Sequence, residues 1–72
     1  MPIIFGNNDT DYVIVRIAGN ESQRHYLESM GFVQGSRVTL ISAIMKNYII
    51  KIGTTRVGVS QEYARRIIVR AA

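Results

Sequence analysis

Apolar residues follow two different spacings along this chain, and each spacing predicts a type of element. A run of β-branched and aromatic residues at positions 12–17 predicts a first strand. The apolar spacing then becomes helical, with Tyr26, Leu27 and Met30 on one face, which predicts a helix over residues 21–30. Asn20 precedes this helix, where its side chain suits an N-cap.

Two glycines mark the end of the predicted helix and the return to strand spacing. Gly31 stands where a helix C-cap favours a left-handed residue, and Gly35 supplies a second bend. Strands are expected at residues 38–42, 48–52, 55–59 and 67–70. Residues 43–47 are a connection with unusual apolar content, Gly53 opens a two-residue hairpin loop, and Ser60 begins a helical turn.

This order of elements predicts the fold class. Five short strands with one helix after the first indicate a mainly β fold with one short helix and a helical turn, namely an SH3-like small barrel of five to six strands. The 72 residues suffice for one domain, residues 1–72. The expected core consists of Val13, Val15, Ile17, Leu27, Met30, Val38, Leu40, Ile50, Ile52, Val57, Val59, Ala64, Ile67 and Val69.

Composition and charge narrow the class of protein. The chain has no cysteine, no recognisable signal peptide and no apolar run of membrane-spanning length, so we expect a soluble cytoplasmic protein. Its first 36 residues hold two basic and four acidic residues, whereas its last 36 hold seven basic and one acidic. An excess of basic residues in one half of a chain is typical of a protein that binds an acidic partner or nucleic acid. In the alternative interpretation, these residues occupy ordinary solvent-facing positions of strands.

Metal binding and catalysis have little support in the residues. Glu21, His25 and Glu28 share one stripe of the predicted helix and are the only metal-ligand candidates. The alternative is an ordinary polar helix face, and no second ligand cluster completes a site. Because no nucleophile–base pair or phosphate-binding glycine pattern is present, we expect neither an enzyme nor a bound cofactor.

Nucleic-acid binding is one alternative function. Four basic residues are expected on the outer faces of adjacent strands, where they form a basic stripe: Arg37, Lys51, Arg56 and Arg70. Aromatic residues that stack on bases are missing among them apart from Tyr48. A proline-rich peptide groove is disfavoured because the chain has no tryptophan and its other aromatics are scattered.

Protein binding has better support, because several apolar residues fall in predicted turns or at the helix end. The candidate partner-binding residues are Met30, Phe32, Val33, Ile44 and Met45. A contiguous exposed apolar patch usually marks a partner surface. In the alternative interpretation Phe32 closes the helix end and Ile44 covers one barrel mouth.

The order of elements and several short motifs together resemble the FeoA family of the bacterial ferrous iron transport system. The resemblance spans residues 12–69 and rests on Leu27, Met30-Gly31-Phe32, Gly35, Val38-Thr39-Leu40-Ile41, Arg56-Val57-Gly58-Val59 and the closing residues Ala64, Ile67 and Val69. The chain departs from the family pattern at two places. It has Gly58 where the family often has alanine, and its residues 43–47 lack a Gly-Pro-like turn.

The resemblance implies an SH3-like fold and a partner, the membrane transporter FeoB with its cytoplasmic GTPase domain. FeoA-like domains also occur fused to metal-dependent repressors, and the family has no agreed catalytic residues. We therefore expect a non-enzymatic accessory protein that docks on FeoB. Direct iron carriage by Glu21, His25 and Glu28 is a third, weaker hypothesis.

Overall fold

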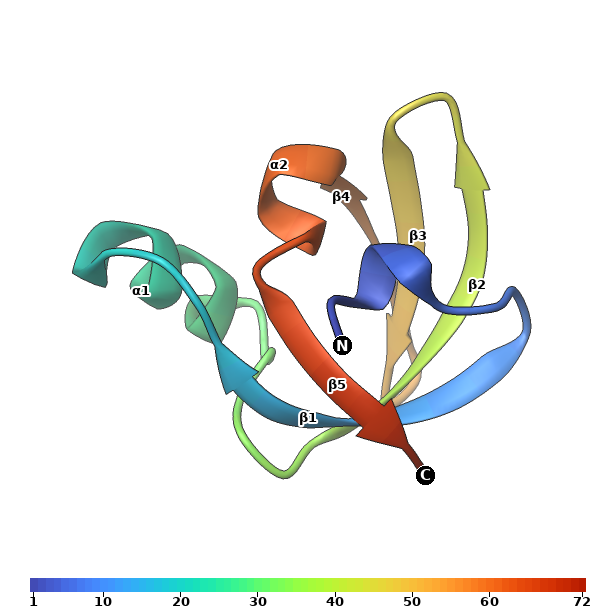
Figure 1. The fold of residues 1–72 in the computed structure, drawn as a ribbon, viewed down its shortest axis with the longest axis horizontal. Coiled ribbons are helices and arrows are strands. Elements are labelled where there is room, and N and C mark those ends of the chain that lie inside the picture. Colours follow the sequence, from blue (N-terminus) through green and yellow to red (C-terminus); the bar gives the residue numbers. More distant parts are fainter.

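The computed structural model describes all 72 residues as a curled five-stranded sheet with one flanking helix (Figure 1). The elements in chain order are the 3-10 helix η1 (Ile3–Phe5), β1 (Thr10–Ile17), α1 (Glu21–Ser29), β2 (Arg37–Ile44), β3 (Asn47–Ile52), β4 (Thr55–Ser60), α2 (Gln61–Ala64) and β5 (Ile67–Ala71). The spatial order of the strands is β4-β3-β2-β1-β5, and every neighbouring pair is antiparallel. The predicted mainly β barrel is confirmed.

The barrel is completed by segments outside the sheet, since β4 and β5 do not pair with each other. The N-terminal segment covers the free edge of β5: the Val69 N–H donates to the carbonyl oxygen of Met1, and the Met1 amino group donates to the Val69 carbonyl, both at 2.7 Å. Helix α2 packs against β3, β4 and η1 and so bridges the opening. A covered edge cannot recruit a strand from another chain.

The face of β1 that points inward differs from our prediction. Tyr12 and Ile14 are buried, whereas Val13 is half-buried and Val15 is exposed. Residues 12–15 are all apolar, so hydrophobicity does not determine which alternate set points inward. A bulge between Ile14 and Arg16 then adds one residue and returns Ile17 to the core.

Helix α1 begins at the predicted residue, Glu21, and ends at Ser29, one residue before the predicted end. The Asn20 side chain accepts from the Gln23 N–H, and the Gln23 side chain accepts from the Asn20 N–H, each at 2.9 Å, which is a capping box. At the other end Gly31 has φ +100°, the left-handed geometry expected of it. The helix is also tied to α2, because the rings of Tyr26 and Tyr63 lie 4.7 Å apart.

The core differs from the predicted set at a few positions. Met30, Ile52 and Val57 are half-buried at its edge instead of fully inside. Four buried residues were not predicted, namely Ile3, Tyr12, Ile14 and Phe32. The complete buried set is Ile3, Tyr12, Ile14, Ile17, Leu27, Phe32, Val38, Leu40, Ile50, Val59, Ala64, Ile67 and Val69. No helix is long and apolar enough to cross a membrane.

Candidate functional site

The five predicted partner-binding residues do not form one surface. Phe32 is fully buried, so its assignment to an exposed patch is wrong, and Met30 is half-buried. Val33 lies in the loop between α1 and β2, 41% exposed, whereas Ile44 and Met45 lie in the β2–β3 hairpin. Figure 1 shows this loop and this hairpin turn at opposite ends of the molecule.

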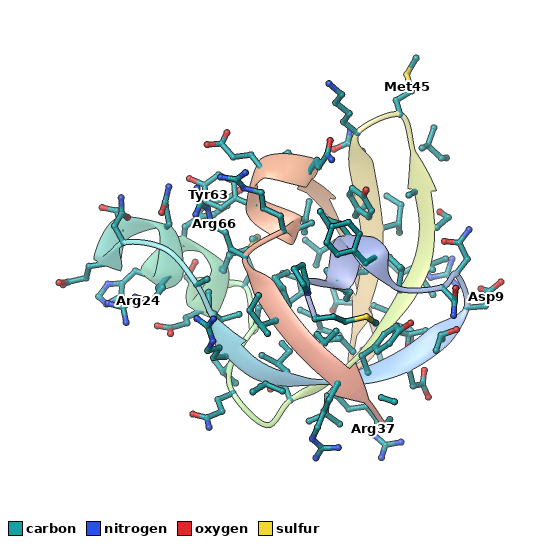
Figure 2. All side chains as sticks on the ribbon, viewed as in Figure 1. Asp9, Arg24, Arg37, Met45, Tyr63 and Arg66 are labelled. Carbon is teal, nitrogen blue, oxygen red and sulfur yellow. The ribbon has the colours of Figure 1, made fainter.

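The β2–β3 hairpin has the most exposed apolar residues of the predicted set. Strand β2 continues to Ile44 and β3 begins at Asn47, so the expected five-residue connection is a two-residue loop of Met45 and Lys46. Ile44 is 65% exposed and Met45 is 94% exposed. We call Ile44 and Met45 the hairpin tip. Figure 2 shows Met45 projecting from the end of the molecule into solvent.

The backbone at Met45 is held in an unfavourable conformation. Its φ is +56°, and Gly53, the first residue of the other two-residue hairpin loop, has nearly the same φ of +57°. Glycine adopts this geometry without a steric penalty, whereas for an L side chain it costs about 1–2 kcal/mol. A strained backbone and a water-exposed thioether both disfavour methionine at this position. The stability of the folded chain therefore does not explain why position 45 is a methionine.

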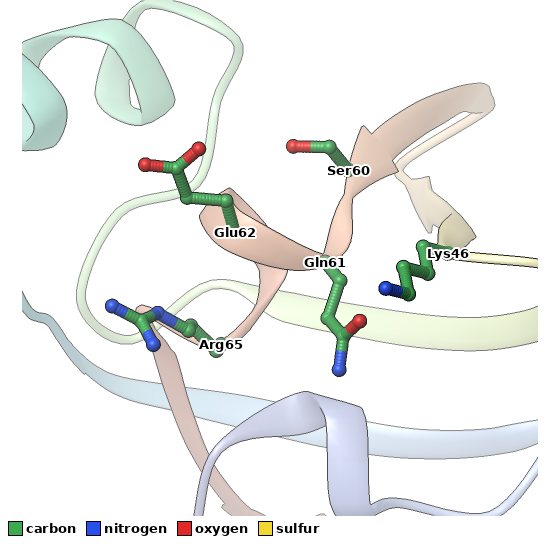
Figure 3. Close-up of a pocket in the computed structure, with 5 residues that line it drawn as sticks. All are labelled: Lys46, Ser60, Gln61, Glu62 and Arg65. Carbon is green, nitrogen blue, oxygen red and sulfur yellow. The ribbon is translucent and has the colours of Figure 1, made fainter.

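The hairpin loop is fastened to the neighbouring helix. The N–H of Gln61, the first residue of α2, donates to the carbonyl oxygen of Lys46 at 2.8 Å. Beside this contact lies a hollow of about 530 Å³ lined by Lys46, Ser60, Gln61, Glu62 and Arg65 (Figure 3). Its lining has no apolar residue, so the hairpin tip stands next to a polar depression.

A further exposed apolar residue, which was not predicted as a contact residue, lies beyond α2. Phe5 of η1 is 70% exposed. It lines a hollow of about 390 Å³ together with Pro2, Ile4, Ala18, Arg65 and Arg66. Arg65 lines both hollows, so the two adjoin its side chain, one near the hairpin loop and the other beside Phe5. The apolar start of the chain was the only sequence signal for this residue.

The metal-ligand candidates remain on the solvent side of α1. Glu21, His25 and Glu28 are all exposed. No three His, Cys, Asp or Glu side chains in the structure are grouped so that they could hold a metal ion. The structure therefore adds no further ligand to this helix stripe.

The predicted basic stripe is present on the outside of the sheet. Strand register places Arg37, Lys51, Arg56 and Arg70 on the outer face, and all four side chains are exposed. Tyr48 lies on the opposite face of β3 from Lys51 and packs against the core. The one aromatic residue considered for base stacking is therefore not part of this face.

Comparison with known proteins agrees with the fold and with the motifs. The sequence matches the FeoA domain family over residues 2–71. The chain belongs to the FeoA family. No curated protein sequence matches it significantly.

Solved structures extend this comparison to the architecture. An iron uptake regulatory protein FeoA superposes with a TM-score of 0.90 at 27% identity, over 97% of this chain and 93% of that one. The zinc complex of Stenotrophomonas maltophilia FeoA, described as a prokaryotic SH3 domain protein, has a TM-score of 0.77 at 21% identity, over 89% and 82% of the two chains. The repressor ScaR with bound zinc superposes at 0.90 and 19% identity, over all of this chain but 37% of ScaR. The fold is thus an SH3-like FeoA barrel.

Proposed function

We propose that this chain is a cytoplasmic, non-enzymatic accessory protein of bacterial ferrous iron uptake that docks on the GTPase-bearing transporter FeoB through its hairpin tip. Membership of the FeoA family supports a role in ferrous iron transport. The observation that carries the docking proposal is Met45, which is 94% exposed at a φ of +56° beside Ile44. Backbone strain at an exposed residue is typical of functional positions.

The surroundings of the hairpin tip suit a protein partner. Apolar side chains at the centre of an interface are commonly surrounded by polar groups. Here the polar hollow supplied by Lys46, Gln61 and Arg65 lies beside the tip. The hydrogen bond from the Gln61 N–H to the Lys46 carbonyl holds the loop in place before binding. A pre-positioned loop loses less conformational entropy when it binds.

The proposal is tested by co-purification with the cytoplasmic GTPase domain of FeoB, using two matched substitutions. Met45→Asp and Val33→Asp each replace an exposed apolar residue with a carboxylate, at opposite ends of the molecule. Aspartate tolerates positive φ better than methionine, so Met45→Asp leaves the fold intact. We expect Met45→Asp to abolish capture and Val33→Asp to retain it.

The converse result would overturn docking through the hairpin tip. Loss of capture only with Val33→Asp would place the interface at the α1–β2 loop. If both variants were captured as well as the unmodified chain, neither Met45 nor Val33 would be a contact with FeoB. Far-UV circular dichroism of each variant confirms that the barrel is folded.

A further inference from the structure

We propose that the outer face of the sheet binds the anionic surface of a lipid membrane, through a basic face formed by Arg37, Lys51, Arg56 and Arg70. This inference concerns a different surface from the hairpin tip and does not depend on the identity of the protein partner. Three observations support it: strand register brings the basic residues together, most of the net charge lies on this face, and the face has no aromatic residue.

Strand register brings the four basic residues together from four strands. Val13 on β1 pairs with Arg37 on one side and with Arg70 on the other. On β3, Lys51 pairs with Thr39 on one side and with Arg56 on the other. Paired residues project to the same side of a sheet, and neighbouring strands are about 4.8 Å apart. The result is four cations on the same side of the sheet: Lys51 and Arg56 are cross-strand neighbours, and Val13 of β1 lies between Arg37 and Arg70.

Most of the net charge of the protein is on this face. Asp11 is the one acidic residue that the register places among the four cations, and its Oδ1 accepts a hydrogen bond of 2.6 Å from the Thr39 hydroxyl. The rest of the chain holds five basic and four acidic residues, so it is nearly neutral. Of the formal net charge of +4, three charges therefore belong to the basic face. The positive potential is directed to one side of the molecule.

A shallow hollow lies within the basic face. It has a volume of about 250 Å³ and is lined by Arg37, Thr39, Lys51 and Gly53. None of these lining residues is hydrophobic. Two cationic side chains flanking a small polar depression suit a phosphate-bearing headgroup better than an apolar ligand.

The residue types on this face favour lipid over nucleic acid. None of the six aromatic residues belongs to it. Three lie in helical segments, two are buried and one packs against the core: Phe5, Tyr26 and Tyr63, then Tyr12 and Phe32, then Tyr48. Binding of single-stranded nucleic acid normally uses aromatic stacking between basic residues. Clusters of four or more Lys and Arg attract anionic lipid headgroups by charge alone, without stacking. The half-buried aliphatic Val13 between Arg37 and Arg70 is compatible with this environment.

Membrane contact through the basic face leaves the hairpin tip accessible. Arg37 begins β2 and Met45 follows its end. Figure 2 shows the two side chains at opposite ends of the molecule. A chain bound by its basic face would thus direct Met45 away from the lipid surface, toward proteins in the aqueous phase.

The test is sedimentation of the full chain with vesicles of pure phosphatidylcholine or of equimolar phosphatidylcholine and phosphatidylglycerol, at moderate ionic strength. We compare the triple variant Arg37→Gln, Lys51→Gln, Arg56→Gln with the matched triple variant Arg24→Gln, Lys46→Gln, Arg65→Gln. Both remove two arginines and one lysine from exposed positions. Each lost contact should weaken binding about fivefold, so the basic-face variant should bind on the order of a hundredfold more weakly.

We expect binding to anionic vesicles only, its loss in the basic-face variant and its retention in the matched variant. Asp11→Asn should tighten binding about fivefold by raising the charge of the face. Absence of binding to anionic vesicles, or equal losses in the two triple variants, would overturn the proposal. Tighter binding to a single-stranded or duplex oligonucleotide at the same salt concentration would also overturn it and assign the face to nucleic acid. Because the vesicles contain no protein, failure here is distinguishable from failure of docking on FeoB.

Discussion

The backbone N–H of Phe32 donates a hydrogen bond to the carbonyl oxygen of Leu27 at 3.2 Å, and both side chains are fully buried. The N–H of Gly31 bonds the carbonyl of Glu28 at 3.0 Å. These two bonds form a Schellman motif, in which the residue after the glycine contacts the last turn of the helix. The motif accounts for a large aromatic residue in a loop: Phe32 closes the end of α1 and is not available to a partner.

Phe32→Ala should be severely destabilising. Truncating a buried phenylalanine costs about 3–5 kcal/mol, while a domain of this length has a total stability of roughly 4–11 kcal/mol. We expect a large decrease in the urea midpoint or a chain that is unfolded at 25 °C. Val33→Ala, at the exposed neighbouring position, should change the free energy of unfolding by less than about 0.5 kcal/mol. Similar values for the two variants would refute the packing role of Phe32.

The capping box at the start of α1 predicts energetic coupling between two residues. Asn20→Ala removes an N-cap acceptor and should lower the free energy of unfolding by about 1 kcal/mol. Gln23→Ala removes the reciprocal bond to the Asn20 N–H. Because the two bonds support the same backbone geometry, the double variant should lose less than the sum of the single variants. Denaturant titration of all four proteins measures this difference, and simple additivity would argue against coupling.

The two hairpin loops predict opposite effects on stability. Adding a side chain at Gly53 should destabilise the fold, whereas removing the side chain of Met45 should not. Gly53→Ala places a Cβ at a φ of +57° with no atom within 4 Å, so its cost of about 1 kcal/mol is conformational. Met45→Gly relieves the same geometry and should be neutral or stabilising by up to about 1 kcal/mol, even though it deletes a large side chain. Melting temperatures measure both effects. A lower melting temperature for Met45→Gly would mean that the methionine stabilises the fold.

The hydroxyl of Tyr12 should contribute measurably to stability. It accepts a hydrogen bond of 2.8 Å from the N–H of Asn7, while its residue is only 3% exposed. Tyr12→Phe leaves this N–H without its acceptor, and we expect a loss of about 1 kcal/mol. Tyr26→Phe is the matched control, since Tyr26 is half exposed and its hydroxyl remains hydrated. Equal effects of the two substitutions in urea unfolding would contradict the role of this bond.

Local physical chemistry was sufficient for most of the elements. The Asn20 cap, the left-handed Gly31 and the Gly53 hairpin were predicted because each depends on residues close together in the chain. The outward basic residues Arg37 and Lys51 were also predicted, because charged side chains on half-buried strands favour the solvent face. The order of these elements predicted the SH3-like barrel, and the resemblance to the FeoA family implied the same fold.

The sequence by itself therefore determined which segments form the five strands and two helices, and which family the chain belongs to, whereas several strand ends differ from the predicted ones by one or two residues. Tertiary structure alone decided which side of β1 faces inward, because Val13 and Ile14 are equally apolar and only packing against Val38 and Val69 selects between them. It also decided that Phe32 is buried while Met45 is exposed, and that Val33 and Met45 lie at opposite ends. Exposure and proximity depend on contacts between segments distant in the chain, and the local spacing of residues does not specify those contacts.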